Sequence, residues 1–441
     1  MNVRPDTLAL LRRLGALGSD RLAATLAFAA EVASGQDYPE RADLAKRVLP
    51  AGLETDDAWA AIKVGRLATR RELALTDAAG GPLGLSLPLA VQRSLHELDR
   101  RLGPTETDPS AGEIAPRPAQ GRFAIKARWS EAVATLQLAG QACDPVAGVV
   151  FLRQSREPKD AAEGLLAHAD AALALARSWG DVPFSPGKVV ELQRCFAGDA
   201  TLPVGAADEA ELRLRLAPLC RFLNAEDGGP FLHPLERAAI GHYWLLHHRP
   251  FAVANGRTAR ALVDWAMARA GYPLFALLAP SRELAAAPAA YAAAVERVAA
   301  DDGDVTHFVV HQVHAIEQAI ATWRNELSRA ETEAQTVASA GSLAAGLNPR
   351  QLALLAHAVR HPEARYGIEA HRRSHGITFP TASADLFDLA DRGLLAVAKE
   401  GRAHVFSPGR AKPPASPARL HRTRRPVLPS EPDDALPVNL L

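Results

Sequence analysis

Two arginines follow an Asn-Gly pair at the point where a helix is expected to begin. Residues 249–260 read RPFAVANGRTAR, so Asn255 and Gly256 stand directly before Arg257, and Arg260 follows one turn later. Unpaired amides and the dipole at a helix N-terminus favour anions, and arginine adds fixed charge and paired donors suited to phosphate. The spacing therefore indicates an anion site, and surface ion pairing of both arginines is the plainer alternative.

Two helices must hold this loop in place. The preceding residues 232–248, LHPLERAAIGHYWLLHH, have the apolar spacing of an amphipathic helix, and Pro250 ends it. The following residues 259–271, ARALVDWAMARAG, predict a second helix that ends at Gly271. The anion site is thus expected in a helix–loop–helix unit.

Residues 249–260 resemble the signature of the Fic family, H-P-F-x-[D/E]-G-N-G-R-x-x-R, and the flanking helices resemble those of the family across 122–326. The resemblance implies a mainly α chain with a Fic-type helical bundle that binds ATP or a related nucleotide. It implies that Asn255 and Gly256 bind the α-phosphate. It also implies that Arg257 binds the β- and γ-phosphates and Arg260 the γ-phosphate.

Three positions depart from the signature, and all three concern the chemistry. The family's catalytic histidine corresponds to Arg249, and arginine stays protonated at physiological pH, so it cannot take a proton from a target hydroxyl. The magnesium-binding acid corresponds to Val253, which has no ligand atom, and the flexible glycine corresponds to Ala254. Phe251, which would anchor the loop, is kept. We therefore expect nucleotide binding without a metal site, and AMP transfer (AMPylation) that is weak or lost.

His248 is a second candidate for the catalytic base. One step along a helix turns a side chain by roughly 100°, so this ring reaches the site only if the helix end shifts. A packing histidine is the alternative.

Two further elements of the family, one regulatory and one for docking, correspond to segments of this chain. Many Fic proteins carry an inhibitory helix, [S/T]-x-x-x-E-[G/N], whose glutamate pairs with the second motif arginine. Residues 135–140, TLQLAG, resemble it and place Ala139 at the glutamate position. The family also docks targets on a β-hairpin, and the corresponding residues 191–216 show no two clear strands.

Composition restricts the class of protein. The 441 residues allow two to four domains, and 50 basic side chains balance 50 acidic ones, so any nucleic-acid surface must be local. No stretch has the length of a membrane span, and the N-terminus lacks the apolar run of a signal peptide. Three widely separated cysteines suit a reducing compartment, so a cytoplasmic protein without membrane partners is expected.

Shifts in composition predict the domain boundaries. The expected segments are a helical module (1–103), a Pro- and Gly-rich linker (104–121), the Fic-like domain (122–326), a connector (327–346), a compact unit (347–408) and a disordered tail (409–441).

The unit at 347–408 resembles the winged helix-turn-helix domains appended to many Fic proteins. Three helices precede a hairpin that turns at Glu400 and Gly401. The expected DNA contacts are Arg372, Arg373, Thr378, Thr381, Ser383, Lys399 and Arg402. Three acids on the third helix, Asp385, Asp388 and Asp391, count against close DNA contact, and a protein–protein module of the same shape is the alternative.

Three functions remain open at this point. The first is a Fic-like protein that binds a nucleotide or another phosphorylated ligand without efficient transfer. The second is an active Fic-type transferase with altered chemistry, in which Arg249 and a nearby histidine act on a different phosphate compound. The third is a DNA-binding transcriptional regulator whose Fic domain is structural. A protein target and a homodimer are further partners left open.

Overall fold

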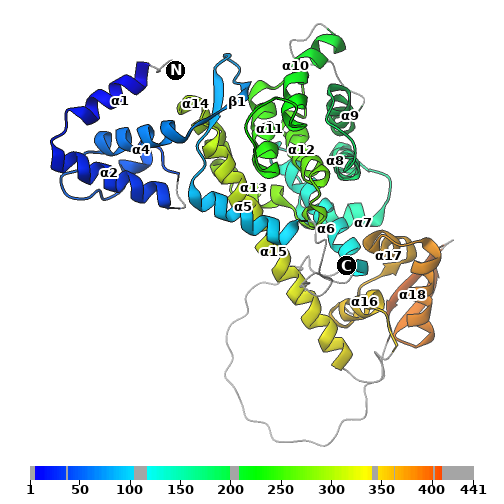
Figure 1. Cartoon of the computed structure of the whole chain (residues 1–441). Coiled ribbons are helices and arrows are strands. Elements are labelled where there is room, and N and C mark those ends of the chain that lie inside the picture. The colour runs from blue at the N-terminus through cyan, green and yellow to red at the C-terminus, as the bar shows by residue number, and fades with distance from the viewer. Residues whose placement is uncertain are drawn as a thin grey trace, which may run out of the picture. The chain divides into compact units, whose positions relative to one another are not determined.

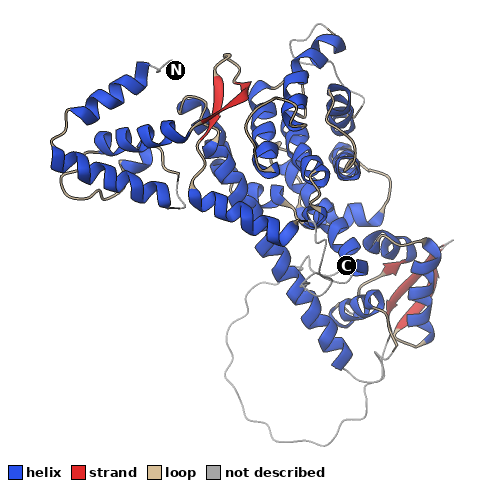
Figure 2. Ribbon diagram, viewed as in Figure 1, coloured by secondary structure: helices blue, strands red, loops and turns tan. Residues whose placement is uncertain are grey.

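The structure is a computed structural model that describes residues 5–35, 38–103, 117–198, 208–339, 346–361, 363–400 and 403–409. These residues are mainly α-helical, as expected, and their strands form two small sheets (Figures 1 and 2). Two compact units are present. The first comprises Met1–Ala111, Ala127–Gly148 and Pro158–Ala321, and the second comprises Gly112–Lys126, Val149–Glu157 and Thr322–Leu441.

The first unit begins with four helices: α1 (Pro5–Gly15), α2 (Ser19–Ser34), α3 (Arg41–Leu44) and α4 (Thr55–Thr69). A buried carboxylate holds three of them together. Asp57 of α4 accepts hydrogen bonds from Arg13 Nε of α1 at 2.6 Å and from Arg21 Nη2 of α2 at 2.7 Å. The negative charge of this buried acid is therefore balanced by cations from two neighbouring helices.

A β-hairpin interrupts the region that the sequence predicted to be a purely helical module. Strand β1 (Arg71–Thr76) pairs antiparallel with β2 (Pro82–Leu85), and Asp77 accepts two backbone amides in the turn. The amide of Gly84 donates to the carbonyl of Gly303, far along the chain. Short strands that are completed by a distant segment leave a weak local signal, which is why the sequence did not predict them.

The next helices along the chain include a central pair, α11 and α12, and three helices, α6, α7 and α15, that each lie only partly in the first unit. The bounds are α5 (Leu89–Leu102), α6 (Arg117–Gln137), α7 (Pro145–Gln154), α8 (Ala161–Ser178), α9 (Pro186–Ala197), α10 (Glu209–Leu223), α11 (Pro234–His248), α12 (Asn255–Arg269), α13 (Pro280–Ala286), α14 (Pro288–Ala300) and α15 (Thr306–Ser339), with a 3-10 turn at Pro273–Leu277. Helices α11 and α12 lie side by side among α8, α9 and α10 (Figure 1). All residues from 235 to 245 are buried, so α11 is a central helix rather than the one-sided amphipathic helix that the sequence predicted.

Two predicted boundaries fall inside helices. Helix α6 begins at Arg117, within the segment 104–121 expected as a linker, and residues 104–116 lie outside the described part of the chain. Helix α15 continues without a break from Thr306 to Ser339, across the expected boundary at 326.

The second unit contains α16 (Pro349–Arg360), β3 (Tyr366–Gly367), α17 (Ile368–His375), α18 (Phe379–Asp391), β4 (Leu395–Glu400) and β5 (Ala403–Pro408). Its antiparallel sheet has the order β3-β5-β4 and packs against the helices through Leu354, Leu386 and Phe406. The prediction of three helices followed by a hairpin is confirmed, as is Asn348 as the N-cap of α16. Most of the predicted tail, residues 410–441, lies outside the described residues.

Over the described ranges, no helix combines the length and apolar character needed to cross a bilayer.

Candidate functional site

The side chain of Asn255 closes the loop between α11 and α12. The resemblance to the family implied that this residue binds a phosphate. The amide of Phe251 donates to Asn255 Oδ1 at 3.0 Å, and Asn255 Nδ2 donates to the carbonyl of Phe251 at 2.6 Å. The Phe251 ring is 2% exposed, which agrees with its expected role as an anchor. Because Oδ1 accepts and Nδ2 donates within the loop, the side chain of Asn255 holds the loop closed at the start of α12.

Backbone amides in the first turn of α12 form the centre of the candidate anion site. The first bond of the helix runs from the amide of Thr258 to the carbonyl of Ala254 at 2.9 Å. Across the described part of the chain, the amides of Asn255, Gly256 and Arg257 have no acceptor, and Ala254 supplies no side-chain cap. Three unpaired donors at a helix N-terminus are suited to a phosphate oxygen.

Arg257 adds charge beside these amides. Its Nη1 donates to the carbonyl of Phe196 at 3.0 Å, which holds the half-buried guanidinium against the end of α9. Its Nε is buried without a partner among the described residues. Burial, together with the nearby Arg260 cation, lowers the pKa of Arg257. A buried cation with an unused donor is stabilised by an incoming anion.

Arg260 is arranged differently from Arg257. It is 5% exposed, and its Nε and Nη2 donate to the hydroxyl and carbonyl oxygens of Thr135 at 2.7 and 2.8 Å. A Cβ added to Gly256 would lie 3.2 Å from Arg260 Nη1, so the guanidinium lies close to the first turn of α12. The segment predicted to be inhibitory does reach this arginine. The contact comes from Thr135, whereas α6 ends at Gln137, before Ala139.

A buried polar layer supports this arrangement, and the sequence analysis did not identify it. Glu131, one turn before Thr135, accepts a hydrogen bond from the amide of Ser281 at 2.9 Å. Burial, with a contribution from Asp264, raises the pKa of Glu131 to about 7. Asp264, one turn after Arg260, is paired with Arg177 at 2.8 Å. The i,i+4 spacing of polar residues on both helices is the signal from which this layer was predictable.

His242 on α11 also belongs to this buried polar layer. Its Nε2 lies 2.8 Å from the hydroxyl of Tyr291, and burial, with Arg260 nearby, holds the pKa of His242 well below the usual range. An uncharged imidazole adds no second cation beside Arg260.

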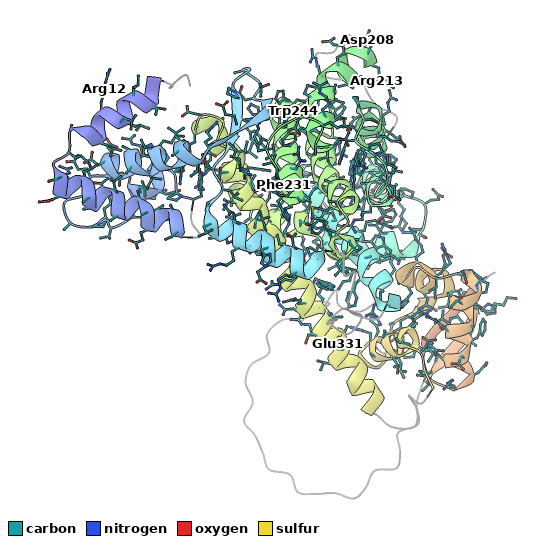
Figure 3. All side chains as sticks on the ribbon, viewed as in Figure 1. Arg12, Asp208, Arg213, Phe231, Trp244 and Glu331 are labelled. Carbon is teal, nitrogen blue, oxygen red and sulfur yellow. The ribbon has the colours of Figure 1, made fainter. Side chains whose placement is uncertain are left out.

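His248 faces the hairpin. Its ring stacks on Trp244, which is labelled in Figure 3, with centroids 4.0 Å apart, and its Nε2 lies 2.9 Å from the carbonyl of Thr76 in β1. A carbonyl only accepts, so Nε2 carries the proton in this contact. Burial lowers the pKa of His248. The ring is thus neutral and engaged with β1.

Arg249 occupies the position of the family's histidine and is exposed. Its backbone is left-handed, with φ 46° and ψ 57°, where it ends α11. It supplies positive charge close to the loop.

The residues at the expected metal position do not fit magnesium. Val253 is 41% exposed and offers only its backbone carbonyl, which accepts a hydrogen bond from Gln193 at 3.3 Å. Magnesium requires oxygen ligands in octahedral geometry. In the described ranges there is also no group of three or more His, Cys, Asp or Glu able to hold a metal ion.

The residues predicted to contact DNA lie on α17, α18 and the hairpin of the second unit. Arg372 is paired with Glu369 at 2.6 Å, whereas the hydroxyls of Thr378 and Thr381 lie 2.8 Å apart. Arg373 and Ser383 are half-buried, Lys399 is exposed, and Arg402 lies outside the described residues.

Two of the acidic residues expected to repel DNA, Asp385 and Asp388, form hydrogen bonds within this unit. Asp385 is buried and accepts hydrogen bonds from Arg350 Nε and Asn348 Nδ2, each at 2.7 Å. Burial alone would raise the pKa of Asp385, but hydrogen bonds from His371 and Arg350 hold it well below its usual range. Hydrogen bonds from Arg392 and Gln351 likewise lower the pKa of Asp388. Both carboxylates are therefore paired within this unit.

Comparison with known proteins finds one family that is similar around this site. Residues 196–267 match the Fic/DOC family. Proteins named protein adenylyltransferase Fic from Drosophila sechellia and Drosophila ananassae are 44% and 43% identical over 72 residues, which are 16% of this chain. The chain thus spans 14% of the length of these curated relatives.

The similar solved structures have lower sequence identity to this chain. A Fic family protein from Desulfovibrio desulfuricans has 16% identity and a TM-score of 0.42, with 74% of this chain and 96% of that chain covered. Fic-1 from C. elegans has 22% identity and a TM-score of 0.43, with 54% and 74% covered.

Proposed function

Because the chain carries a Fic/DOC family domain at residues 196–267, we propose that it binds a nucleotide or a related phosphorylated ligand at the start of α12, and that AMP transfer is weak or lost. One observation carries the proposal: the amides of Asn255, Gly256 and Arg257 remain without acceptors in the described chain, beside a guanidinium with an unused donor. Backbone donors and a buried cation together suit a phosphate.

The same site lacks the groups that transfer requires. A protein hydroxyl becomes nucleophilic when a base removes its proton, and Arg249 cannot accept one. Loss of a general base costs a factor of about 10²–10⁴ in rate. Val253 provides no carboxylate, so charge that develops on the phosphates would be balanced by arginine alone.

Calorimetric titration of the full chain with ATP and with ADP tests the binding. Saturable binding of at least one nucleotide is expected. The absence of binding to either would refute the proposal. Incubation with α-labelled ATP and magnesium tests the transfer: strong labelling of the chain would favour the alternative of an active transferase with altered chemistry.

A second function is favoured by one observation in the second unit. The carboxylates of Asp385 and Asp388 are engaged by Arg350, Asn348, Gln351 and Arg392, so α18 is less acidic toward a partner than its sequence suggests. We propose that this unit acts as a winged helix-turn-helix and binds DNA weakly. Few basic residues imply few phosphate contacts and a shallow salt dependence.

Mobility shifts with the full chain at increasing salt test this second proposal. Arg373→Ala should weaken binding to all sequences and reduce the slope of log K against log salt by about 1. Tight binding that persists at high salt, or a slope unchanged in Arg373→Ala, would contradict it.

A further inference from the structure

A cavity of about 520 Å³ lies between α2, α4 and the segment that leads into α5, and its lining shares no residue with the candidate anion site. Helices α2 and α4 pack side by side (Figure 1). Small residues line the space between them, among them Ala29 and Ala33 of α2 and Ala61, Gly65 and Ala68 of α4. Because these residues are small, the space stays open. Volumes of about 300–1,000 Å³ are typical of small-molecule sites.

The walls of the cavity are mainly apolar, and its opening is apolar as well. Val32, Ile62 and Leu87 line it together with the alanines. Leu26 of α2 and Leu89 of α5 also line it and are 48% and 62% exposed, so both lie where the cavity meets solvent. Exposed leucines beside an apolar cavity favour a ligand with a hydrocarbon part, because that part would cover them.

Arg66 of α4 is the one charged side chain among the described residues that line the cavity. It is 8% exposed, and its Nη2 donates to the carbonyl of Pro39 at 2.8 Å. Its guanidinium lies over the ring of Tyr38, with Cζ 3.5 Å from the ring centroid. Its Nη1 is buried and has no hydrogen-bond partner in the described ranges. An immobilised cation with an unused donor therefore borders the cavity.

The ion pair of this cation is shared with other residues. Asp301 Oδ2 lies 3.9 Å from Arg66 Nη1, beyond hydrogen-bonding distance. The same carboxylate pairs with Lys63, and it lies 3.0 Å from His307 Nε2. Asp301 thus balances the charge of Arg66 only in part. A second acceptor at this buried guanidinium would be stabilising.

We propose that this cavity binds an amphipathic carboxylic acid, with its carboxylate on Arg66 and its hydrocarbon chain along the alanines of α2 and α4. A planar guanidinium matches the two oxygens of a carboxylate. A single positive charge among apolar walls repels a cationic head group and gives a neutral one no ionic partner. The proposal is independent of nucleotide binding at α12.

Calorimetric titration of the full chain with octanoate, octanol and octylammonium at one ionic strength tests the choice of head group. Octanoate should bind about tenfold or more tightly than octanol, which has the same chain and no charge. Octylammonium should bind more weakly than either. Hexanoate should bind about tenfold or more weakly than octanoate, because each buried CH₂ group contributes a factor of about four.

Two pairs of variants locate the site. Arg66→Met removes the charge at similar length and should reduce the preference for octanoate over octanol to about threefold or less. Arg70→Met, at a neighbouring arginine outside the lining of the cavity, should leave the preference unchanged. Ala29→Phe places a ring in the cavity and should weaken octanoate binding by about tenfold or more. Ala23→Phe, at an exposed alanine of α2 outside the cavity, should have no effect.

Octanoate that binds no more tightly than octanol, or that shows no saturable binding, overturns the proposal and leaves nucleotide binding at α12 unaffected. Octanoate binding by Ala29→Phe as tight as by the wild type overturns it too. Sedimentation identifies a different occupant: a chain that self-associates, and that Ala29→Phe makes monomeric, would place a second copy in the cavity and contradict the proposal. If Arg66→Met does not fold, the comparison of head groups and Ala29→Phe decide.

Discussion

The motif at residues 249–260 has two halves, residues 249–254 and residues 255–260. The two halves differ in burial and in hydrogen bonding. In the first half Arg249, Ala252 and Val253 are exposed, and Arg249 and Ala254 have left-handed backbones. In the second half the side chain of Asn255 closes the loop, and Arg260 is buried against α6. All three departures from the Fic signature fall in the first half.

This contrast has a physical explanation. Substitution of an exposed side chain changes stability by a few tenths of a kcal/mol, whereas loss of a buried hydrogen-bonded group costs more. The second half therefore serves the fold as well as any ligand. At exposed positions such as Arg249 and Val253 the residue type matters mainly for catalysis and metal binding. Catalysis can therefore be lost there while the fold remains.

The largest effect should come from restoring the first half. Arg249→His with Val253→Asp supplies a base and a metal ligand and leaves α12 unchanged, so self-labelling with α-labelled ATP and magnesium should rise by a factor of about 10² or more. Arg249→His alone should give less.

A double variant that binds ATP but transfers no label would contradict the view that two positions limit the chemistry. Ala254 would then be limiting as well.

A pair of single variants compares the two halves directly. Arg257→Ala removes the cation beside the α12 amides and should weaken nucleotide binding by about 10-fold to 100-fold, since charge-assisted hydrogen bonds contribute about 1.5–3 kcal/mol. Arg249→Ala removes an exposed charge and should weaken binding by less than about threefold. Calorimetry measures both, and equal losses would show that the two halves contribute alike.

Magnesium should matter little to the wild type. Val253 offers no carboxylate, so the affinity for ADP should change by less than about twofold on addition of the metal. In Val253→Asp the same addition should strengthen binding measurably. A magnesium requirement for tight binding by the wild type would place metal ligands elsewhere and contradict this account.

The smallest effect concerns the backbone. Ala254 has φ 67°, in the left-handed region where a side chain costs about 1–2 kcal/mol relative to glycine. Ala254→Gly should therefore stabilise the chain by about 1 kcal/mol, after the greater entropy of unfolded glycine is subtracted. Ala252→Gly, at a neighbouring position without a positive φ, should be neutral or destabilising. Chemical denaturation measures the difference, and stabilisation by both variants would point to the unfolded state.

Local sequence was sufficient for the helices around the site and for the C-terminal unit. Asn348 before Pro349, and Gly271 after a regular apolar pattern, are short-range signals of helix ends, and the structure has ends near these positions. The hairpin of β1 and β2 was missed, because its short strands are completed by a distant segment that includes Gly303.

The sequence by itself determined the Asn-Gly-Arg turn between two helices and the replacement of its histidine and acid, because these depend only on residue type and spacing. Tertiary structure decided how each side chain is used. Arg257 and Arg260 look equivalent in the sequence, yet one keeps an unused donor and the other is bound to Thr135. The partner of each lies on another helix, and only packing brings such residues together.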